Sequence, residues 1–370
     1  MDEKCTCIIC NEEFDYTDMT EFDGEMLCPD CLADETTHCN RCGERIWNSE
    51  NEGNDEVPLC GHCYDYYYTS CEDCGRLLAL DDACYLDEND IPYCQSCFQT
   101  RENDIHIHDY NYKPNPIFYG SGTRFFGVEL EIDGSGKDSE NAESIERCAN
   151  VAAELIYIKS DGSIDEGFEI VTHPMTLDFH RKQMPWRSIL AKALELGYMS
   201  HKTTTCGLHI HTNRDSFGRN VEEQEERISR VLFFVERFWQ ELLKFSRRTE
   251  SAIKRWAARY GMKDCPKEVL DTAKKGYGGR YTCVNITNFS TIEFRIFRGT
   301  LRYTTLIATL ELVNEICNIA VTMSDNQLGK LSWPEFVARI DKKENPELIT
   351  YLKERQLYVN EPIIAAEEEK

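Results

Sequence analysis

The stretch FFGVELEIDG, residues 125–134, alternates apolar and acidic side chains. Successive side chains of a β-strand point to opposite faces, so the apolar residues from Val128 to Ile132 would share one face of a strand. Glu129 and Glu131 would share the other face. A face of this kind either meets solvent or forms one wall of a site that holds a cation.

Three later segments repeat this design, with apolar residues on one face of a predicted strand and mainly polar residues on the other. The polar faces carry Glu169 in GFEIV, His209, His211 and Asn213 in GLHIHTN, and Glu293, Arg295 and Phe297 in TIEFRIFR. Each pattern alone is common on solvated strands, and an isolated Glu–Arg pair contributes little stability. Together, the four segments predict a sheet whose polar face is the functional site.

The fold class follows from the segments around these strands, which have helical periodicity. Residues 220–247, for example, place Val231, Phe234 and Phe238 on one stripe. Further helices are predicted over residues 139–155, 175–197 and 303–323. The sequence therefore predicts an α+β domain in which helices cover one face of an antiparallel sheet.

The first hundred residues contain six C-x-x-C pairs that form three repeats. The pairs are Cys7/Cys10 with Cys28/Cys31, Cys39/Cys42 with Cys60/Cys63, and Cys71/Cys74 with Cys94/Cys97. The first cysteine of each repeat recurs every 32 residues. Two such knuckles offer four thiolates to one tetrahedral zinc ion. Three structural zinc ions are therefore expected, in modules that resemble treble-clef or LIM-like fingers.

The pairing of these cysteines is left open by the sequence. One zinc per module is the simplest arrangement, but a cross-brace between alternate pairs has the same spacing, and Cys5 could replace Cys7. A closed four-thiolate site offers no position for a substrate, so such modules bind partners rather than perform chemistry. Because modules of this size cannot build a sufficient apolar core, the metal would supply their folding energy.

Charge and cysteine usage bound the function classes. Residues 1–97 hold 25 acidic and 4 basic residues, a net charge of −21 within a total of −25. This argues against general nucleic-acid binding but not against a protein partner. The start MDEKCTCIIC does not read as a signal peptide, and no 18-residue apolar run is present. We expect a cytoplasmic protein without a membrane span, whose 19 cysteines serve metal rather than disulfides.

Six parts are expected along the chain. They are zinc modules at 1–34, 35–66 and 67–100, a linker at 101–120, a catalytic domain at 121–325, and a helical extension with an acidic tail at 326–370. The linker lacks helical periodicity and contains Pro114 and Pro116. Its His106 and His108 have no second ligand pair nearby in the sequence.

Carboxylates with histidine suit magnesium or manganese, and arginine beside such ions stabilises a transferring phosphoryl group. The order E-x-E, D-G-S, strand Glu, G-x-H-x-H, E-x-R resembles the carboxylate–amine ligases related to glutamine synthetase and glutamate–cysteine ligase. CGLHIHTN and TIEFRIFRGTL in particular resemble the amidoligase family of bacteria, fungi and phages, over about residues 120–325. A phage-encoded member would act in the host-cell cytoplasm.

The resemblance implies a glutamine synthetase-like catalytic core. ATP, with magnesium or manganese, would phosphorylate a carboxylate, and an amine would then attack the acyl phosphate. Metal and nucleotide would be bound by Glu129, Glu131, Glu169, His209 and Glu293. Catalytic roles near the phosphates, the substrate carboxylate or the amine would fall to His211, Arg295, Arg298 and Asp161. The substrates would be a small-molecule or peptide carboxylate and an amine.

Two other functions compete with this one. A metal-dependent hydrolase of an amide or phosphate would use a similar ligand set and would act without ATP. A non-catalytic zinc-finger adaptor would bind no nucleotide. Residues 248–280 are expected to form one of the loops that build the substrate pocket. The basic residues in and beside this segment suit either phosphate or an acidic substrate, or a solvated surface, and they are Arg247, Arg248, Arg255, Lys274, Lys275 and Arg280.

Overall fold

The computed structural model describes residues 4–85, 90–103, 105–203, 205–276 and 279–359. The chain divides into two compact units, Met1–Ile105 and His106–Lys370. The acidic tail expected at the C-terminus, from residue 360 on, lies outside the described residues.

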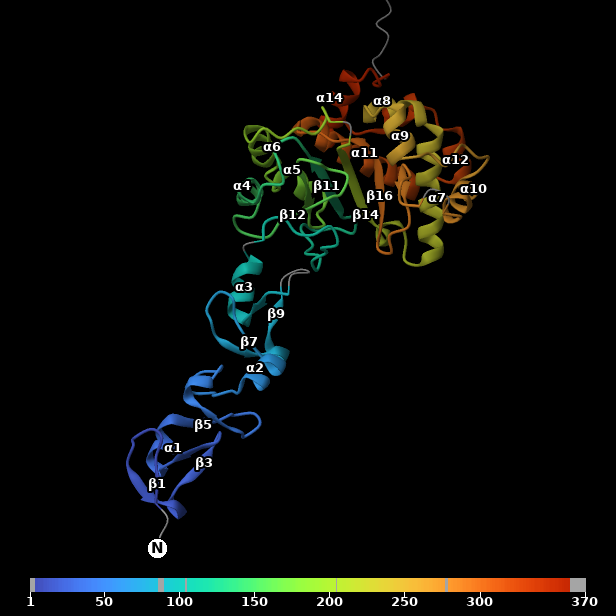
Figure 1. The fold of residues 1–370 in the computed structure, drawn as a ribbon. Coiled ribbons are helices and arrows are strands. Elements are labelled where there is room, and N and C mark those ends of the chain that lie inside the picture. Colours follow the sequence, from blue (N-terminus) through green and yellow to red (C-terminus); the bar gives the residue numbers. More distant parts are fainter. Residues whose placement is uncertain (1–3, 86–89, 104, 204, 277–278, 360–370) are drawn as a thin grey trace, which may run out of the picture. The chain divides into compact units, whose positions relative to one another are not determined.

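The first unit consists of three consecutive modules, coloured blue to cyan in Figure 1. In each module short hairpin strands, four in the first and third modules and two in the second, precede a helix that begins between the cysteines of the second pair. The elements are β1 (Lys4–Thr6), β2 (Glu13–Asp15), β3 (Thr20–Phe22), β4 (Glu25–Leu27) and α1 (Pro29–Glu35); β5 (Thr36–His38), β6 (Arg45–Trp47) and α2 (Gly61–Tyr67); β7 (Tyr68–Ser70), β8 (Leu77–Ala79), β9 (Cys84–Tyr85), β10 (Pro92–Tyr93) and α3 (Gln95–Asn103). Helix α1 runs directly into β5, and α2 into β7, so no linker separates the modules.

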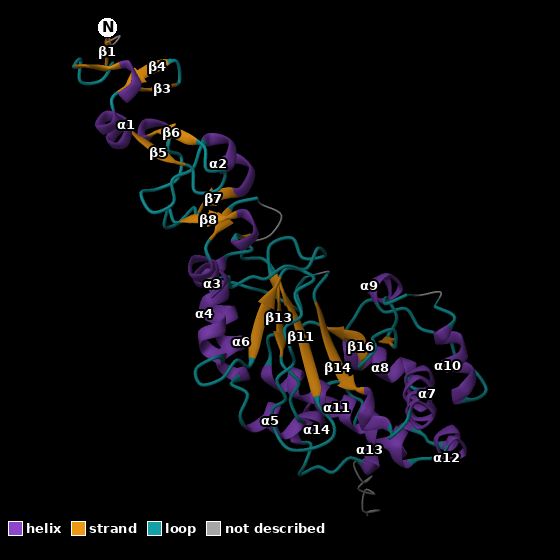
Figure 2. Cartoon of the chain, turned by 90° about the horizontal axis from the view of Figure 1, so that it is seen from below, coloured by secondary structure: helices purple, strands orange, loops and turns teal. Residues whose placement is uncertain are grey.

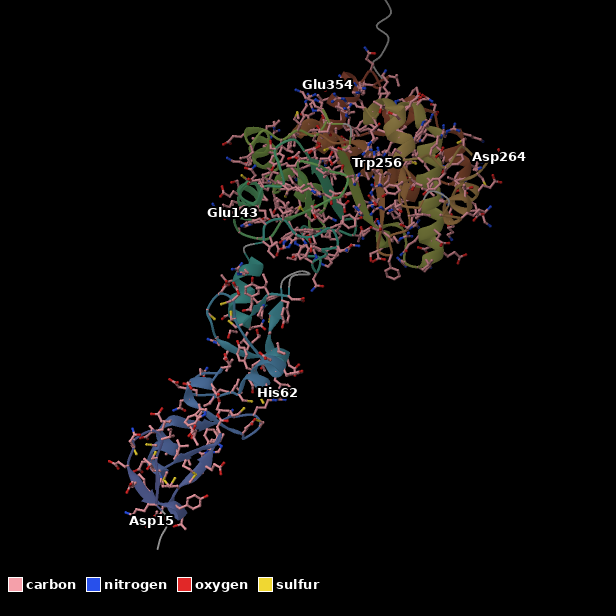
Figure 3. The ribbon with its side chains drawn as sticks, viewed as in Figure 1. Asp15, His62, Glu143, Trp256, Asp264 and Glu354 are labelled. Atoms are coloured by element: carbon pink, nitrogen blue, oxygen red, sulfur yellow. The ribbon has the colours of Figure 1, made fainter. Side chains whose placement is uncertain are left out.

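The cysteines gather in three groups of four, one per module, and sulfur atoms are visible among the hairpins in Figure 3. The groups are Cys7, Cys10, Cys28 and Cys31; Cys39, Cys42, Cys60 and Cys63; and Cys71, Cys74, Cys94 and Cys97. Sulfur–sulfur distances of 4.0, 3.8 and 3.7 Å occur across the pairs. Four thiolates around zinc lie about 3.8 Å apart, given a Zn–S bond of about 2.3 Å. The clusters fit zinc with one ion per module, and neither a cross-brace nor Cys5 takes part.

The second unit is built on a six-stranded antiparallel sheet in the order β12-β13-β11-β14-β16-β15. Its strands are β11 (Phe126–Ile132), β12 (Ile156–Lys159), β13 (Phe168–Thr172), β14 (Gly207–Asn213), β15 (Val284–Asn285) and β16 (Thr291–Arg298). Val128, Leu130 and Ile132 on one face of β11 are fully buried. Strand β11 lies between β13 and β14, so its other face is central in the sheet.

One residue of the sheet departs from strict alternation. Ile210 pairs with Phe294, but Leu208 pairs with Phe297, so a β-bulge adds one residue to β16. Phe297 therefore lies opposite Leu208 on the apolar face and packs edge-on against Phe245. The prediction that Phe297 faces the polar side was wrong for this reason.

Helices cover the apolar face of the sheet, with α5, α11 and α14 lying across it in Figure 2. The helices of this unit are α4 (Ser139–Ala149), α5 (Leu177–Lys182), α6 (Trp186–Glu195), α7 (Val221–Arg237), α8 (Trp239–Ser246), α9 (Glu250–Trp256), α10 (Pro266–Lys274), α11 (Tyr303–Thr322), α12 (Asp325–Lys330), α13 (Trp333–Arg339) and α14 (Pro346–Glu354). The helix predicted over 175–197 is split because Pro185 lacks the N–H that would continue α5. The predicted α+β architecture with helices on one face is confirmed.

Helix α11 is the one helix of the described ranges that is long and apolar enough to cross a membrane, with a mean hydropathy of 1.3. However, 72% of its apolar window is buried. Its Glu311 accepts hydrogen bonds from the Arg181 guanidinium of α5 and from the Leu348 backbone N–H of α14. Burial raises the pKa of Glu311 to about 7. The helix is thus the centre of the core, and the C-terminal helices belong to that core.

The segment predicted as a linker is partly integrated into the second unit. Residues 101–103 end α3, whereas the His108 backbone pairs with β12 through hydrogen bonds to Ile158 and Ser160. Tyr119 pairs with Met175, and His106 lies 2.7 Å from the Glu146 carboxylate. From His106 onward, the segment is therefore an extended wall of the second unit.

The zinc assignment predicts about three zinc ions per chain. Cys7→Ser should lower the count to about two, because three thiols hold zinc far less tightly, while Cys5→Ser two residues earlier should keep three. Elemental analysis gives the counts, and hydrogen exchange after chelation should show lost protection in residues 4–103 but not in the sheet. A metal-free first unit with unchanged protection would contradict the assignment.

Buried His180 predicts a loss of stability in acid. Its Nε2 donates to the Phe126 carbonyl and its Nδ1 accepts from Trp186 Nε1, and burial lowers its pKa to about 4. The His180 ring binds a proton more tightly in the unfolded chain than in the folded one. Its contribution to the free energy of unfolding is therefore complete above about pH 6.5 and falls by about 3 kcal/mol as the pH drops toward 4. Urea unfolding between pH 7.5 and 5 should show a smaller decline in His180→Gln than in the parent or exposed-site control His62→Gln. Equal declines would contradict the account.

Candidate functional site

The polar face of the sheet brings ionisable residues from five strands together. Cross-strand register places Glu129 beside His209, Glu131 beside Glu169, and His211 beside Glu293. Lys159 of β12 extends the row, with its Nζ 3.3 Å from Glu169 Oε2. Because the register of an antiparallel sheet fixes which side chains are neighbours, these contacts follow from the strand pairing.

Glu129 lies at the centre of this constellation and faces two histidines. Its Oε2 lies 3.5 Å from His209 Nδ1, and its Oε1 lies 3.2 Å from His211 Nε2. Glu169 completes a group with Glu129 and His209, and Glu293 completes another with Glu129 and His211. In each group the candidate ligand atoms lie within 4.8 Å of one another. The geometry therefore offers two adjacent cation sites that share one carboxylate.

The donor atoms at the centre fit metal ions rather than a closed hydrogen-bond network. His209 Nδ1 and His211 Nε2 are buried and form no hydrogen bond with any described residue. Both nitrogens face carboxylate oxygens. Two histidine nitrogens and three carboxylates suit magnesium or manganese at neutral pH.

The clustered charges of the site also favour the binding of a cation. Burial, followed by the nearby Glu129 carboxylate, raises the pKa of Glu169 well above its ordinary value. Burial opposes ionisation of Glu129 too, but the His211 and His209 rings hold its pKa well below the usual range. Clustered carboxylates repel one another in a low dielectric, and a divalent ion relieves that repulsion.

Glu131 has a different place from Glu129. It is 5% exposed, its Oε2 accepts a hydrogen bond from the Gly207 backbone N–H, and its Oε1 lies 3.7 Å from His209 Nε2. It belongs to neither group of candidate ligands. A carboxylate behind a ligating histidine orients the ring and strengthens its basicity. The structure thus gives different positions relative to the metal sites to two glutamates that the sequence pattern does not distinguish.

The remaining predicted residues lie at different distances from the centre. Arg295 forms an ion pair with Glu293 of its own strand, and its Nε is buried without a hydrogen-bond partner in the described chain. Asp161 lines the same cavity, and its Oδ1 accepts hydrogen bonds from the backbone N–H and hydroxyl of Ser163. Arg298 lies beyond the bulge opposite Gly207, and its Nη2 donates to the Thr203 carbonyl. It lines other hollows instead.

Three further residues border the site without having been named as site residues. Lys159 follows the same period-two pattern, so the alternation of IYIK could have revealed it. Asn285 donates to Glu293 Oε2 at 2.9 Å and orients that carboxylate from a strand of only two residues. Arg248 is buried behind Gly207, and no sequence signal distinguishes it from the neighbouring surface arginines.

A cavity of about 590 Å³ opens over the ligand groups. The wall formed by residues 110–118 supplies Tyr110, Lys113 and Phe118, and the β15–β16 turn supplies Phe289. This volume falls in the range of cofactor and substrate pockets. The segment predicted as a linker therefore lines the candidate active site.

Comparison with known proteins assigns the chain to a family. The family described as "Putative amidoligase enzyme" matches residues 129–317, just over half of the chain, and the protein belongs to this amidoligase family. The match begins at Glu129 and includes both candidate ligand groups. The wall at 110–118 and the zinc modules lie before it.

Two other comparisons add little. A search of curated proteins found no match. The crystal structure of the complex between prokaryotic ubiquitin-like protein Pup and its ligase PafA is similar at 9% identity and a TM-score of 0.27, over 57% of this chain and 52% of that chain. The chain thus spans about half of that ligase's length, and the assignment rests on the family match.

The shared ligand predicts unequal effects of two isosteric substitutions. Glu129→Gln should weaken both manganese sites of the zinc-loaded protein by on the order of a hundredfold or more, because each loses an anionic oxygen. Glu131→Gln should weaken binding only about tenfold, as for loss of a group that orients a ligand. Manganese titration followed by electron paramagnetic resonance measures both. Equal losses in the two variants would show that Glu129 is not shared.

Proposed function

We propose that this amidoligase is an ATP-dependent ligase that joins a carboxylate to an amine through an acyl phosphate, forming an amide or isopeptide bond. The observation that carries the proposal is the placement of Glu129, with one oxygen toward His209 and the other toward His211. Membership of the amidoligase family supports the class of reaction. In this proposal the six-stranded sheet is a glutamine synthetase-like catalytic core.

Two divalent ions would be held on the polar face of the sheet. Glu129, Glu169 and His209 would bind one ion, and Glu129, His211 and Glu293 the other. When bound, magnesium or manganese supplies positive charge that neutralises phosphate oxygens. Asn285 keeps Glu293 oriented by donating to its second oxygen.

The cationic side chains of the cavity would act on the phosphoryl group and the acyl donor. Arg295 presents a planar guanidinium whose fork can bind two phosphate oxygens at once. Lys159 remains protonated, because Glu169 and Glu129 raise its pKa against the opposing effect of burial. It can therefore hold the reacting carboxylate near the transferred group.

The chemistry divides into two displacements. In the first, a carboxylate oxygen takes the terminal phosphoryl group of ATP, which releases ADP. In the second, the amine nitrogen attacks the acyl carbon and inorganic phosphate leaves. Asp161, in the D-G-S turn, would hold the incoming ammonium and accept its proton. The wall at residues 110–118 would limit access of water, which would otherwise hydrolyse the acyl phosphate.

The zinc modules would serve binding rather than catalysis in this scheme. Their four-thiolate groups leave no open coordination position for a substrate. Their net charge of −21 over residues 1–97 suits a basic protein partner or substrate. A cytoplasmic location and the absence of general nucleic-acid binding are part of the same proposal.

Oxygen-18 transfer tests the reaction type. With a carboxylate labelled in both oxygens, one labelled oxygen should appear in inorganic phosphate for each amide formed, because the acyl–oxygen bond breaks in the second step. Glu129→Gln serves as the inactive control. Release of AMP and pyrophosphate would replace this route by adenylation. Product formation without ATP would favour a two-metal hydrolase, for which the same ligand groups are suited.

A further inference from the structure

A second polar region lies next to the candidate active site. Two adjoining hollows of about 340 and 600 Å³ share Arg248 and Arg298, and we call them together the arginine groove. Their basic lining residues are Lys244, Arg247, Arg248, Arg255, Arg298 and Arg355. Among the described residues no carboxylate lines either hollow. The groove lies in the nearly neutral part of the chain, because residues 1–97 carry −21 of the net charge of −25.

No ion pair among the described residues neutralises the groove, and carboxylates compensate its charge only in part. Glu131 acts on Arg248 from the metal-site side, and Glu354 acts on Arg247 and Arg355. In the described parts of the chain Arg259, Arg295 and Arg302 pair with glutamates, whereas none of the six groove residues does. His201 lines a neighbouring hollow together with Arg247 and Arg298, and its pKa is lowered by burial and then by these two arginines. The groove therefore carries a positive field that an anionic ligand would neutralise.

Backbone contacts hold the guanidiniums without neutralising them. Arg355 donates to the Lys244 carbonyl at the end of α8, Arg298 to the Thr203 carbonyl, and Arg248 to the Phe297 carbonyl. Basic residues at a helix end commonly serve this purpose. Arg255 differs from these three arginines in that its guanidinium stacks on the Trp256 ring at the edge of the groove.

The ends of two helices border the groove. Arg247 and Gln356 have positive φ angles of 62° and 53°, and in the described residues of the second unit no other non-glycine residue does. Both residues lie where a helix ends, Arg247 after α8 and Gln356 after α14, and a left-handed residue is a common way to end a helix. The turn at Arg247 ends α8 and lets Arg248 enter the interior while Arg247 stays at the groove.

Arg248 connects the groove to the metal-binding groups. A Cβ on Gly207 would overlap both Arg248 Nη2 and His209 Nε2, so glycine allows the guanidinium and the imidazole to approach each other. Arg248 is 8% exposed and lines both hollows. A ligand in the groove would thus lie one side chain away from a candidate ligand of the metal.

We propose that the arginine groove binds an extended acidic peptide segment and that this segment presents the carboxylate to be activated. The proposal deepens the proposed function and rests on it for the reaction. A peptide fits better than a small acid because the basic groups extend from Arg255 to Arg355 across two hollows. Figure 3 labels Trp256, which stacks with Arg255, and Glu354, the neighbour of Arg355.

Peptide binding to the full-length, zinc-loaded protein without ATP tests this proposal. A fluorescent peptide of eight glutamates should bind at low salt, and a matched peptide of eight glutamines should not. Arg255→Gln and Arg355→Gln should each raise the Kd about three- to tenfold, since each removes one partly exposed charge. Lys254→Gln, one residue away on the same helix, and Arg339→Gln on α13 are matched controls and should change the Kd less than twofold.

Each alternative result has a definite meaning. Equal Kd values in the groove variants and the controls, or equal binding of both peptides, would overturn the proposal. Displacement by glutarate or inorganic phosphate at concentrations as low as the peptide's own would assign the groove to a small anion instead. Because no ATP is present, peptide binding is measured separately from the oxygen-18 test, and either result can fail while the other stands.

Discussion

The crowding of carboxylates on one face of a buried sheet is the constraint on which the second unit depends. Glu131, Glu169 and Glu293 are at most 5% exposed, and Glu129 lies between them. Ionised groups so close together are costly to bury unless cations share the space. Lys159, Arg248 and Arg295 supply part of that charge, and the two ligand groups around Glu129 provide places for the remainder.

The opposite face of the sheet keeps this arrangement in register. The apolar face of β11 is fully buried, and His180 fastens the start of that strand to α5 and α6 through two hydrogen bonds. Glu311 joins α5, α11 and α14 beneath the sheet. A shift of one residue in any central strand would turn its ionisable side chains into the core. Packing on the apolar face of the sheet thus fixes the positions of the ionisable side chains on its polar face.

The sequence predicts this design where local periodicity controls it. Alternation placed Glu129 and His209 on one face, and cysteine spacing predicted three four-thiol modules. Alternation cannot predict a β-bulge, so Phe297 was assigned to the wrong face. It also cannot distinguish the roles of Glu129 and Glu131, because Glu131 is set apart by a hydrogen bond from the Gly207 backbone N–H. Arg248 and the wall at 110–118 reach the site through tertiary contacts that no local pattern encodes.

The most direct test of the central claim is the location of bound manganese in crystals of the protein with ADP. Anomalous scattering should show two peaks on the polar face of the sheet, each within bonding distance of a different Glu129 oxygen. One peak should lie beside Glu169 and His209, and the other beside Glu293 and His211. Manganese bound elsewhere in the chain, with no peak near Glu129, would contradict the account.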